Sequence, residues 1–180
     1  MSQTVTKLSL FYDIYKSPLG TLYLIFSGKF LCSISFTKPS NTPFKKESAP
    51  GSFIKELRSY FNDGKNEFKQ EVKFFTGTDF EKNVWSVLKE IPFGQTRSYK
   101  WVAEKVGKPA AVRAVGRALS KNPVPIIVPC HRVIESDGSI GGYSSGVKRK
   151  RRLLDMEYYS RQQREKRMQG RTTVLPARET

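Results

Sequence analysis

Histidine and cysteine are scarce in this sequence of 180 residues, which has one histidine and two cysteines, Cys32 and Cys130. Three such side chains cannot supply the four ligands of a zinc site without carboxylates, so we predict no metal site. Two cysteines in a chain of this length do not indicate a fold stabilised by several disulfides. Residues 1–10 lack the apolar core of a signal peptide, and no stretch approaches the roughly 20 apolar residues that span a bilayer. We therefore expect a reduced, cytoplasmic protein without a membrane partner.

Acidic residues are also few, because 16 Asp and Glu stand against 32 Lys and Arg, giving a net charge of +16. The imbalance lies mainly in residues 81–180, which hold 21 of the 32 basic residues and 9 of the 16 acidic ones. Such a surface favours an anionic partner. Nucleic acid is preferred over a membrane surface, because the charge accompanies a DNA-binding pattern described below.

Residues 1–76 are predicted to form a small β-rich unit. Three apolar runs separated by turns indicate an antiparallel meander: residues 8–15, 21–26 and 30–36. Cys32 lies in the third run and is expected in the strand core. After a loop over residues 37–50, the apolar face of a helix is expected to hold Phe53, Leu57, Tyr60 and Phe61, with Gly64 ending the helix. Residues 67–75 are a candidate further strand, and Gly77 marks the boundary.

Residues 77–160 are predicted to form a helical unit. Thr78 and Glu81 have the spacing of a capping box, and an apolar stripe follows through residues 80–91. A second helix is expected over residues 99–106, and a third from Pro109 to Leu119. Residues 161–180 are polar and basic without a clear period, and they indicate a flexible tail whose first turns are a candidate helix.

The second and third helices, joined by a Gly-Lys-Pro turn, form a candidate helix-turn-helix. At 100° per residue, Val112, Val115 and Leu119 share one face of the third helix, while the opposite face holds Ala110, Arg113, Ala114 and Arg117. Alanines allow close approach to a nucleic acid, and arginine supplies a planar charged probe. An ordinary amphipathic helix gives the same spacing, so this pattern alone does not decide. The basic run at residues 148–152 is a candidate phosphate-contact patch.

The apolar run at residues 126–128 leads into Pro129-Cys130-His131-Arg132, which places the single histidine beside a cysteine. Only the thiolate of cysteine is a good nucleophile, and a free thiol titrates near pH ~8.5. A neighbouring imidazole can take its proton directly or through a water. An isolated pair of this kind is more often a core cysteine next to a polar histidine. The flanking residues reverse that preference.

The run Asn-Pro-Val-Pro-Ile-Ile-Val-Pro-Cys-His-Arg-Val-Ile at residues 122–134, followed by Gly-Gly-Tyr-Ser at 141–144, closely resembles the O6-alkylguanine-DNA alkyltransferases, or methylated-DNA–protein-cysteine methyltransferases. The likeness extends over residues 80–157. It implies an α+β protein: a small RNase H-like antiparallel sheet with a helix, then a helical, winged helix-turn-helix-like domain. The boundaries would be 1–76, 77–160 and a tail from 161.

The resemblance implies DNA repair by direct damage reversal. O6-alkylguanine, and O4-alkylthymine as a second expected substrate, would be flipped out of duplex DNA, and its alkyl group would move irreversibly to Cys130, once per molecule and without a cofactor. His131 would act on Cys130 through a water, and Glu157 would orient His131. Asn122 would brace the active-site turn.

Further roles follow from the same resemblance. Tyr99 would help to rotate the nucleotide, and Arg113 would fill the vacated stack on a face shared with Ala110, Ala114 and Arg117. The base pocket would be lined by Val133, Tyr143, Ser144, Ser145 and Lys150. Ser145 replaces a glycine that is usual in the family and would narrow the pocket mouth, which predicts weaker reaction with O6-benzyl than with O6-methyl groups.

Three other classes of protein compete with this interpretation. A non-catalytic alkyltransferase-like lesion-binding module would have another residue in place of Cys130. A cysteine hydrolase would need a route for deacylation, and a redox-sensing regulator would need more side chains for base readout than one arginine on an alanine-rich face. We therefore expect a monomer acting on double-stranded DNA that carries O6-alkylguanine, associated with the nucleoid in a prokaryote. Cooperative binding along DNA stays open.

Overall fold

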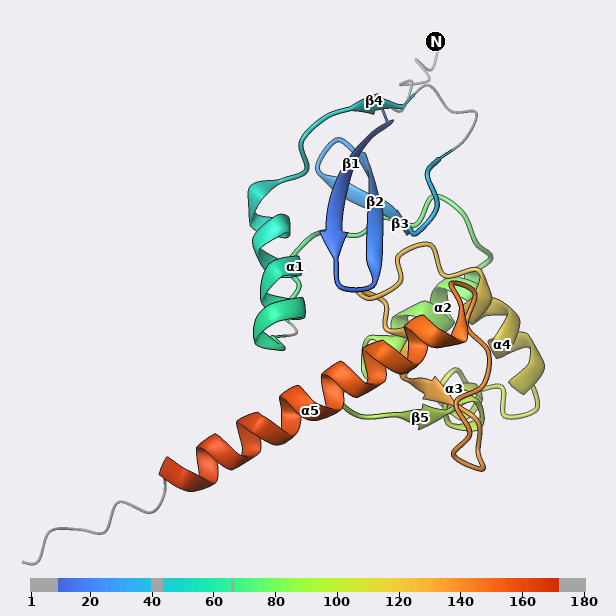
Figure 1. Ribbon diagram of the computed structural model, residues 1–180. Helices are drawn as coiled ribbons and strands as arrows, with labels where there is room; N and C mark the ends of the chain where they lie inside the picture. Colours follow the sequence, from blue (N-terminus) through green and yellow to red (C-terminus); the bar gives the residue numbers. More distant parts are fainter. Residues whose placement is uncertain (1–9, 40–43, 66, 172–180) are drawn as a thin grey trace, which may run out of the picture.

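The computed structural model describes residues 10–39, 44–65 and 67–171. Figure 1 shows a small sheet with one helix beside it, and below them a cluster of helices from which the last helix extends outward. The expected α+β architecture, with the sheet first and the helices second, is confirmed. Among the described residues, no helix is long and apolar enough to cross a membrane.

The sheet contains β1 (Leu10–Ser17), β2 (Gly20–Ser27), β3 (Phe30–Ser35) and β4 (Lys45–Lys46) in the order β3-β2-β1-β4. The first three strands are antiparallel neighbours, as the meander predicts, whereas β4 pairs with β1 in parallel. Alternate residues of β2 are fully buried, which gives the sheet one core face. Residues 8 and 9 of the first predicted strand lie outside the described residues.

Two expectations for this sheet are wrong. Cys32 is only half-buried, because its neighbour Leu31 takes the core-facing position in β3. Residues 67–75 do not form a strand; Val72 makes one isolated parallel bridge with Leu31. The Leu31 amide donates to the Glu71 carbonyl and the Lys73 amide donates to the Leu31 carbonyl, so the segment lies beside β3 at a single bridge and does not continue as a ladder.

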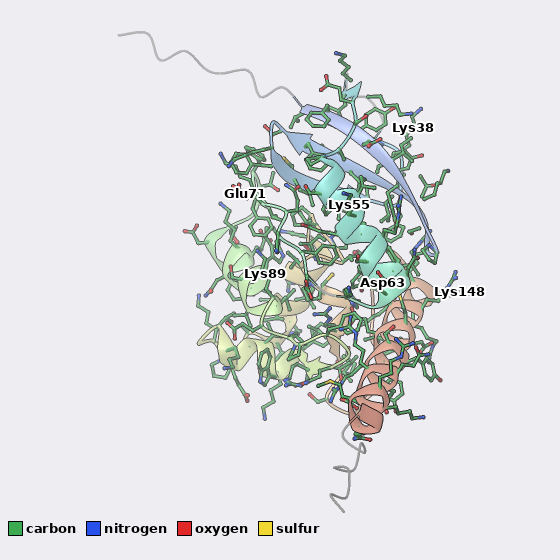
Figure 2. All side chains as sticks on the ribbon, turned by 90° about the vertical axis from the view of Figure 1, so that its left-hand side faces the viewer. Lys38, Lys55, Asp63, Glu71, Lys89 and Lys148 are labelled. Carbon is green, nitrogen blue, oxygen red and sulfur yellow. The ribbon has the colours of Figure 1, made fainter. Side chains whose placement is uncertain are left out.

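Helix α1 (Gly51–Asp63) covers the sheet with the four residues predicted for its apolar face. Phe53 meets Phe26 of β2 edge to face at 5.9 Å, and Phe61 stacks on Tyr15 of β1 at 6.0 Å. Gly64 ends the helix in the left-handed region, with φ 59°. Figure 2 shows α1 lying across the sheet, with Lys55 on its exposed side.

The helical part contains α2 (Asp79–Leu88), α3 (Tyr99–Lys105) and α4 (Val112–Ser120). The short strands β5 (Arg97–Ser98) and β6 (Val133–Ile134) pair in parallel. The capping box at the start of α2 is confirmed: Thr78 accepts from the Glu81 amide, and the Glu81 carboxylate accepts from the Thr78 amide at 2.8 Å. Trp85 then fixes α2 to α4, because its Nε1 donates to the Ala118 carbonyl at 2.8 Å.

Helix α4 begins three residues later than predicted. Residues 108–111 form a turn in which the Ala111 amide donates to the Lys108 carbonyl, so Ala110 lies before the helix. The later start leaves Val112 exposed, and Ala118 joins Val115 and Leu119 on the buried face. The expected exposed face is otherwise confirmed for Arg113, Ala114 and Arg117.

The last helix, α5 (Val147–Arg171), continues through residues 161–171, so the first turns of the expected tail are helical, which was the candidate structure for them. An i,i+4 ion pair between Arg161 and Glu165 at 2.8 Å supports this extension, and Arg164 donates to the carbonyl of Asp63 at the end of α1. Residues 172–180 lie outside the described residues.

The basic run at residues 148–152 is only partly a solvated surface. Arg149 packs over the ring of Phe36 and donates to the Leu19 carbonyl, and Lys150 is fully buried. Lys148, Arg151 and Arg152 are exposed and stay candidates for phosphate contact. The helix phase explains the division, because α5 packs one face against the rest of the protein.

The two parts share one continuous core. The amide of Ile34 in β3 donates to the carbonyl of Pro123 at 2.9 Å, and Phe74 packs on Trp85 at 4.9 Å. Gly77, at the expected boundary, has φ 96°, and a Cβ there would lie 2.6 Å from the Trp85 ring. The connection therefore needs glycine both for its backbone angle and for close packing. The domain boundary itself stays a prediction.

Replacing Thr78 by alanine tests the cap of α2. The substitution leaves the Glu81 amide without its side-chain acceptor, so we expect the free energy of unfolding to fall by about 1 kcal/mol in urea denaturation. Thr76→Ala, two residues before the cap, is the matched control. Equal losses in both variants would contradict the capping role.

Candidate active site

The residues before the cysteine form a strained turn held by one amide side chain. Ile126 has φ 80°, which is a costly conformation for a β-branched residue. Asn122 fixes the turn at both ends: its Oδ1 accepts from the Val124 amide at 3.0 Å, and its Nδ2 donates to the Val128 carbonyl at 2.8 Å. The bracing expected of Asn122 therefore matches its contacts.

Cys130 opens a short 3₁₀ turn, η1 (Cys130–Arg132), and is almost fully buried. Asn122 Nδ2 also lies 3.0 Å from its Sγ. Burial raises the pKa of the Cys130 thiol, while the hydrogen bond from Asn122 and the charge of Lys150 oppose that rise. The resting group is therefore a thiol, and the site holds donors that stabilise the thiolate once a base removes the proton.

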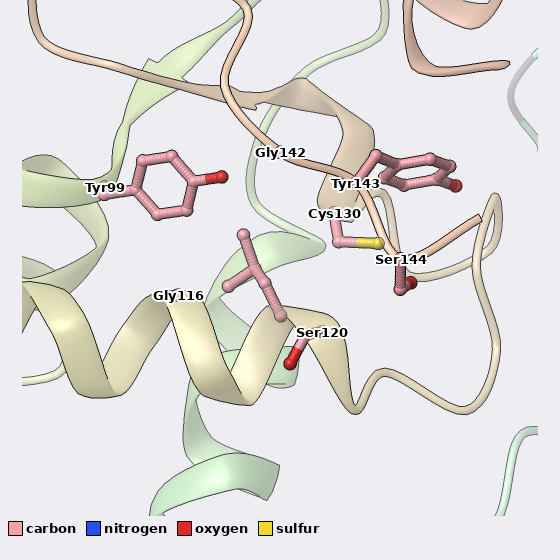
Figure 3. Close-up of a pocket in the computed structure, with 8 residues that line it drawn as sticks. Tyr99, Gly116, Ser120, Cys130, Gly142, Tyr143 and Ser144 are labelled. Atoms are coloured by element: carbon pink, nitrogen blue, oxygen red, sulfur yellow. The ribbon is translucent and has the colours of Figure 1, made fainter. Parts of the chain in front are cut away.

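Cys130 borders a cavity of about 300 Å³. Its lining comes from α3, α4, η1 and the loop before α5: Tyr99, Gly116, Leu119, Ser120, Cys130, Gly142, Tyr143 and Ser144. Figure 3 shows the sulfur of Cys130 between the Tyr99 ring on one side and Tyr143 with Ser144 on the other, while α4 closes the cavity below. A cavity of this size is at the lower end of the range for small-molecule sites.

The cavity agrees with part of the predicted pocket. Tyr99, Tyr143 and Ser144 line it, whereas Val133 is fully buried and, like Ser145 and Lys150, is not among the lining residues. The Ser145 carbonyl accepts from Arg149 at 2.8 Å, and the narrowing of the pocket mouth by its side chain stays a prediction.

Sequence reasoning missed four lining residues: Gly116, Leu119, Ser120 and Gly142. Gly116 carried a usable signal, since a glycine inside a helix often marks a close approach. A Cβ at Gly116 would lie 3.9 Å from the Tyr99 ring, on the cavity side of α4. Gly142 lies in the Gly-Gly-Tyr-Ser run that supports the resemblance, whereas Leu119 and Ser120 have no local pattern that assigns them to a cavity.

Behind the cysteine, the carboxylate of Glu157 is fully buried and accepts hydrogen bonds from several elements. Its Oε1 lies 2.8 Å from His131 Nε2, and Arg132 donates to both oxygens at 2.8 and 2.9 Å. The amide of Gly94 and the hydroxyl of Tyr60 also donate to it. Burial raises the pKa of Glu157, but His131 and Arg132 outweigh burial and hold the pKa well below its usual range. Glu157 is therefore a carboxylate.

His131 is held in the tautomer that a base requires. Burial lowers the pKa of its imidazole and outweighs the opposing effect of Glu157, so the ring is neutral near pH 7. A carboxylate only accepts, so the proton of the neutral ring lies on Nε2. Nδ1 has no hydrogen-bond partner among the described residues and is free to accept a proton.

Lys150 supports the cavity from behind its wall. Its Nζ donates to the carbonyl of Gly142 at 3.1 Å and lies 5.8 Å from the centre of the Tyr99 ring. Burial lowers the pKa of Lys150 to about 8, although Cys130 and Glu135 oppose the shift. The amine is thus largely protonated at pH 7, and its positive charge favours a thiolate at Cys130.

The exposed face of α4 adjoins this cavity. Arg113, Ala114 and Arg117 face solvent on the same helix that contributes Gly116 and Ser120 to the cavity lining. Together, the fold and the site define a protein that combines a helix-turn-helix surface with a cysteine at the edge of a small cavity. Comparisons with known proteins agree with this class.

Two family models match the chain: the ribonuclease-like domain of 6-O-methylguanine DNA methyltransferase over residues 10–74, and its DNA-binding domain over residues 79–159. The methylated-DNA–protein-cysteine methyltransferase of Methanosarcina barkeri is 42% identical over 159 residues, covering 82% of this chain and 97% of its own. That of Mycobacterium tuberculosis is 41% identical over 151 residues, covering 81% and 91%. The chain belongs to the 6-O-methylguanine DNA methyltransferase family.

Solved structures give the same result. M. tuberculosis OGT in complex with DNA aligns with a TM-score of 0.78 and 40% identity, covering 83% of this chain and 93% of that one. The O6-methylguanine-DNA methyltransferase from Pyrococcus kodakaraensis aligns with a TM-score of 0.61 and 27% identity, covering 82% and 98%. The predicted family and the fold, including the ribonuclease-like first domain, are confirmed.

Replacing Lys150 by methionine tests its electrostatic effect on the thiol. Without a positive charge near Cys130, we expect the thiol pKa to rise and alkylation by iodoacetamide near pH 7 to slow about tenfold. The reaction is followed against pH by mass spectrometry in a Cys32→Ser background. Lys148→Met, on the exposed face of the same helix, is the control. An unchanged thiol pKa in Lys150→Met would exclude this role.

Proposed function

We propose that this protein repairs O6-alkylguanine in double-stranded DNA by transferring the alkyl group to its own Cys130. The observation that carries the proposal is the position of Cys130 Sγ, at the edge of a cavity beside α4 and in front of the buried His131–Glu157 pair. The membership of the family and the name methylated-DNA–protein-cysteine methyltransferase borne by its relatives support the same reaction.

The reaction begins with the loss of the thiol proton. His131 Nδ1 accepts that proton through a water, and Glu157 stabilises the imidazolium that results. The thiolate, held by Asn122 and Lys150, attacks the alkyl carbon. A carbon–sulfur bond forms as the carbon–O6 bond breaks, and the electron pair passes to the purine ring, which takes up the displaced proton at N1. The products are a thioether at Cys130 and unmodified guanine.

The base must leave the duplex to reach the sulfur, which costs a few kcal/mol and less for a damaged pair. The exposed face of α4 would approach the backbone closely through Ala114, with Ala110 in the preceding turn. Arg113 would fill the space left in the stack, and the Tyr99 ring at the cavity would contact the extruded base. O4-alkylthymine presents the same kind of alkyl carbon and is a second proposed substrate.

One protein molecule repairs one lesion, because no group in the described cavity is placed to remove an alkyl group from a thioether. The presence of Cys130 at the cavity, next in sequence to a His131 that is hydrogen-bonded to Glu157, favours this reaction over a non-catalytic lesion-binding module. We propose that the protein acts as a monomer in the cytoplasm, where the DNA of a prokaryote lies, and that it uses no cofactor.

Intact-mass spectrometry tests the nucleophile. Mixed with a duplex that carries one O6-methylguanine, the protein should gain the mass of one methyl group, located on the Cys130 peptide. Cys130→Ala should gain nothing and still bind the alkylated duplex, whereas Cys32→Ala should react like the unaltered protein. Methyl transfer by Cys130→Ala would reject this nucleophile, and binding without transfer by the unaltered protein would indicate a lesion-binding module.

Arg113→Ala separates base extrusion from chemistry. Stack filling is worth about 1–3 kcal/mol, so the rate with duplex O6-methylguanine should fall about tenfold or more. The rate with free O6-benzylguanine should change little, because that substrate needs no extrusion. Single-turnover rates with both substrates are the measurement, and Arg58→Ala, an exposed arginine on α1, is the matched control. Similar losses with both substrates would show that Arg113 does not fill the stack.

A further inference from the structure

Tyr60 connects the first domain to the candidate active site. It lies on α1, and its hydroxyl donates to Glu157 Oε1 at 2.6 Å across 97 positions of sequence. Both side chains are fully buried. Burial and the negative charge of Glu157 raise the pKa of Tyr60 well above its usual value, so the hydroxyl keeps its proton and acts as a donor.

Tyr60 and His131 bind the same oxygen of that carboxylate. Oε1 receives the Tyr60 hydroxyl, His131 Nε2 and one Arg132 nitrogen, whereas Oε2 receives Arg132 Nε and the Gly94 amide. A hydrogen bond from Tyr60 withdraws electron density from Oε1 and thereby weakens its attraction for the imidazole proton. It also fixes the rotation of the carboxylate, and with it the orientation of the ring.

The Tyr60 ring is locked by aromatic neighbours from both domains. It meets Phe61 at 5.1 Å and Phe68 at 5.4 Å, both from the first domain, and Phe93 of the second domain at 5.9 Å. Phe93 in turn lies under the guanidinium of Arg132, 5.6 Å from the ring centre. A hydroxyl enclosed in this way has little freedom to leave Glu157, so its contact is part of the resting site.

We propose that Tyr60 is a positioning residue for alkyl transfer, through which the first domain sets the orientation and the proton affinity of His131. This inference rests on the proposed function. The ribonuclease-like domain thereby takes part in the reaction, because the hydroxyl of its Tyr60 is one of the groups that hold the Glu157 carboxylate against His131.

Loss of the Tyr60 hydroxyl should shift the pH dependence of the transfer rate in one direction. In Tyr60→Phe, Glu157 loses a donor and becomes a stronger acceptor for His131 Nε2–H, so the pKa of His131 rises. The other groups that face the pair stay in place: Arg132 from η1, Lys150 from α5, the Cys130 thiol, and the Gly94 amide. A higher His131 pKa leaves less neutral imidazole at a given pH, so the acidic limb of the transfer rate moves to higher pH.

Because His131 is the only histidine in the sequence, its titration is measurable by NMR in an untagged protein without assignment of other imidazoles. We expect the pKa of His131 to be higher in Tyr60→Phe than in the unaltered protein, and the acidic limb of single-turnover transfer to free O6-benzylguanine to move to higher pH by the same amount. Tyr159→Phe, an exposed tyrosine on α5, should change neither.

An unchanged or lowered His131 pKa in folded Tyr60→Phe would overturn the inference, as would a transfer rate that drops equally at all pH values. That second result would mean that the hydroxyl matters for stability only. The NMR titration requires no alkyl transfer. If the unaltered protein failed to react while the Tyr60 effect on His131 persisted, the proposed function would fail and the coupling would stand.

Discussion

The structure depends on how one buried carboxylate, Glu157, is neutralised. A carboxylate without partners in a protein interior costs several kcal/mol, and removal of one partner from such a pair is strongly destabilising. Here Arg132 of η1 supplies the opposite charge, while His131, Tyr60 and Gly94 supply further donors. These partners come from both domains and from three stretches of sequence. The geometry of the candidate nucleophile is therefore inseparable from the packing of the two domains.

Elements defined by local chemistry were predictable from the sequence. The meander followed from turns and apolar runs, α1 from its phase, and α2 from Thr78 and Glu81. The predicted start of α4 was wrong. Pro109 is compatible with the first turn of a helix, but it is equally compatible with the separate turn that residues 108–111 form before the helix. The end of α5 could not be placed from the sequence, because residues 161–171 have no apolar stripe. An ion pair and a contact with α1 support this part of the helix.

The candidate site, too, was only partly predictable from the sequence. Cys130 and His131 are adjacent in sequence and could be inferred from the residues themselves, whereas Asn122 and Glu157 followed from the resemblance. The role of Tyr60 could not be inferred, because its partner Glu157 lies 97 positions away in the sequence and its position on the apolar face of α1 is typical of a core aromatic residue. Arg132 and Lys150 have basic side chains that are normally exposed, yet both are buried here. Charge patterns alone do not reveal which member of a basic run finds an internal partner.

The strained turn at Ile126 bears on the stability of the protein after repair. Asn122 holds this turn with the same amide nitrogen that lies 3.0 Å from Cys130 Sγ. Once the sulfur is a thioether, it is a weaker acceptor, and the added carbon occupies space next to a nearly fully buried side chain. The spent molecule therefore differs from the active one in conformational stability as well as in chemistry.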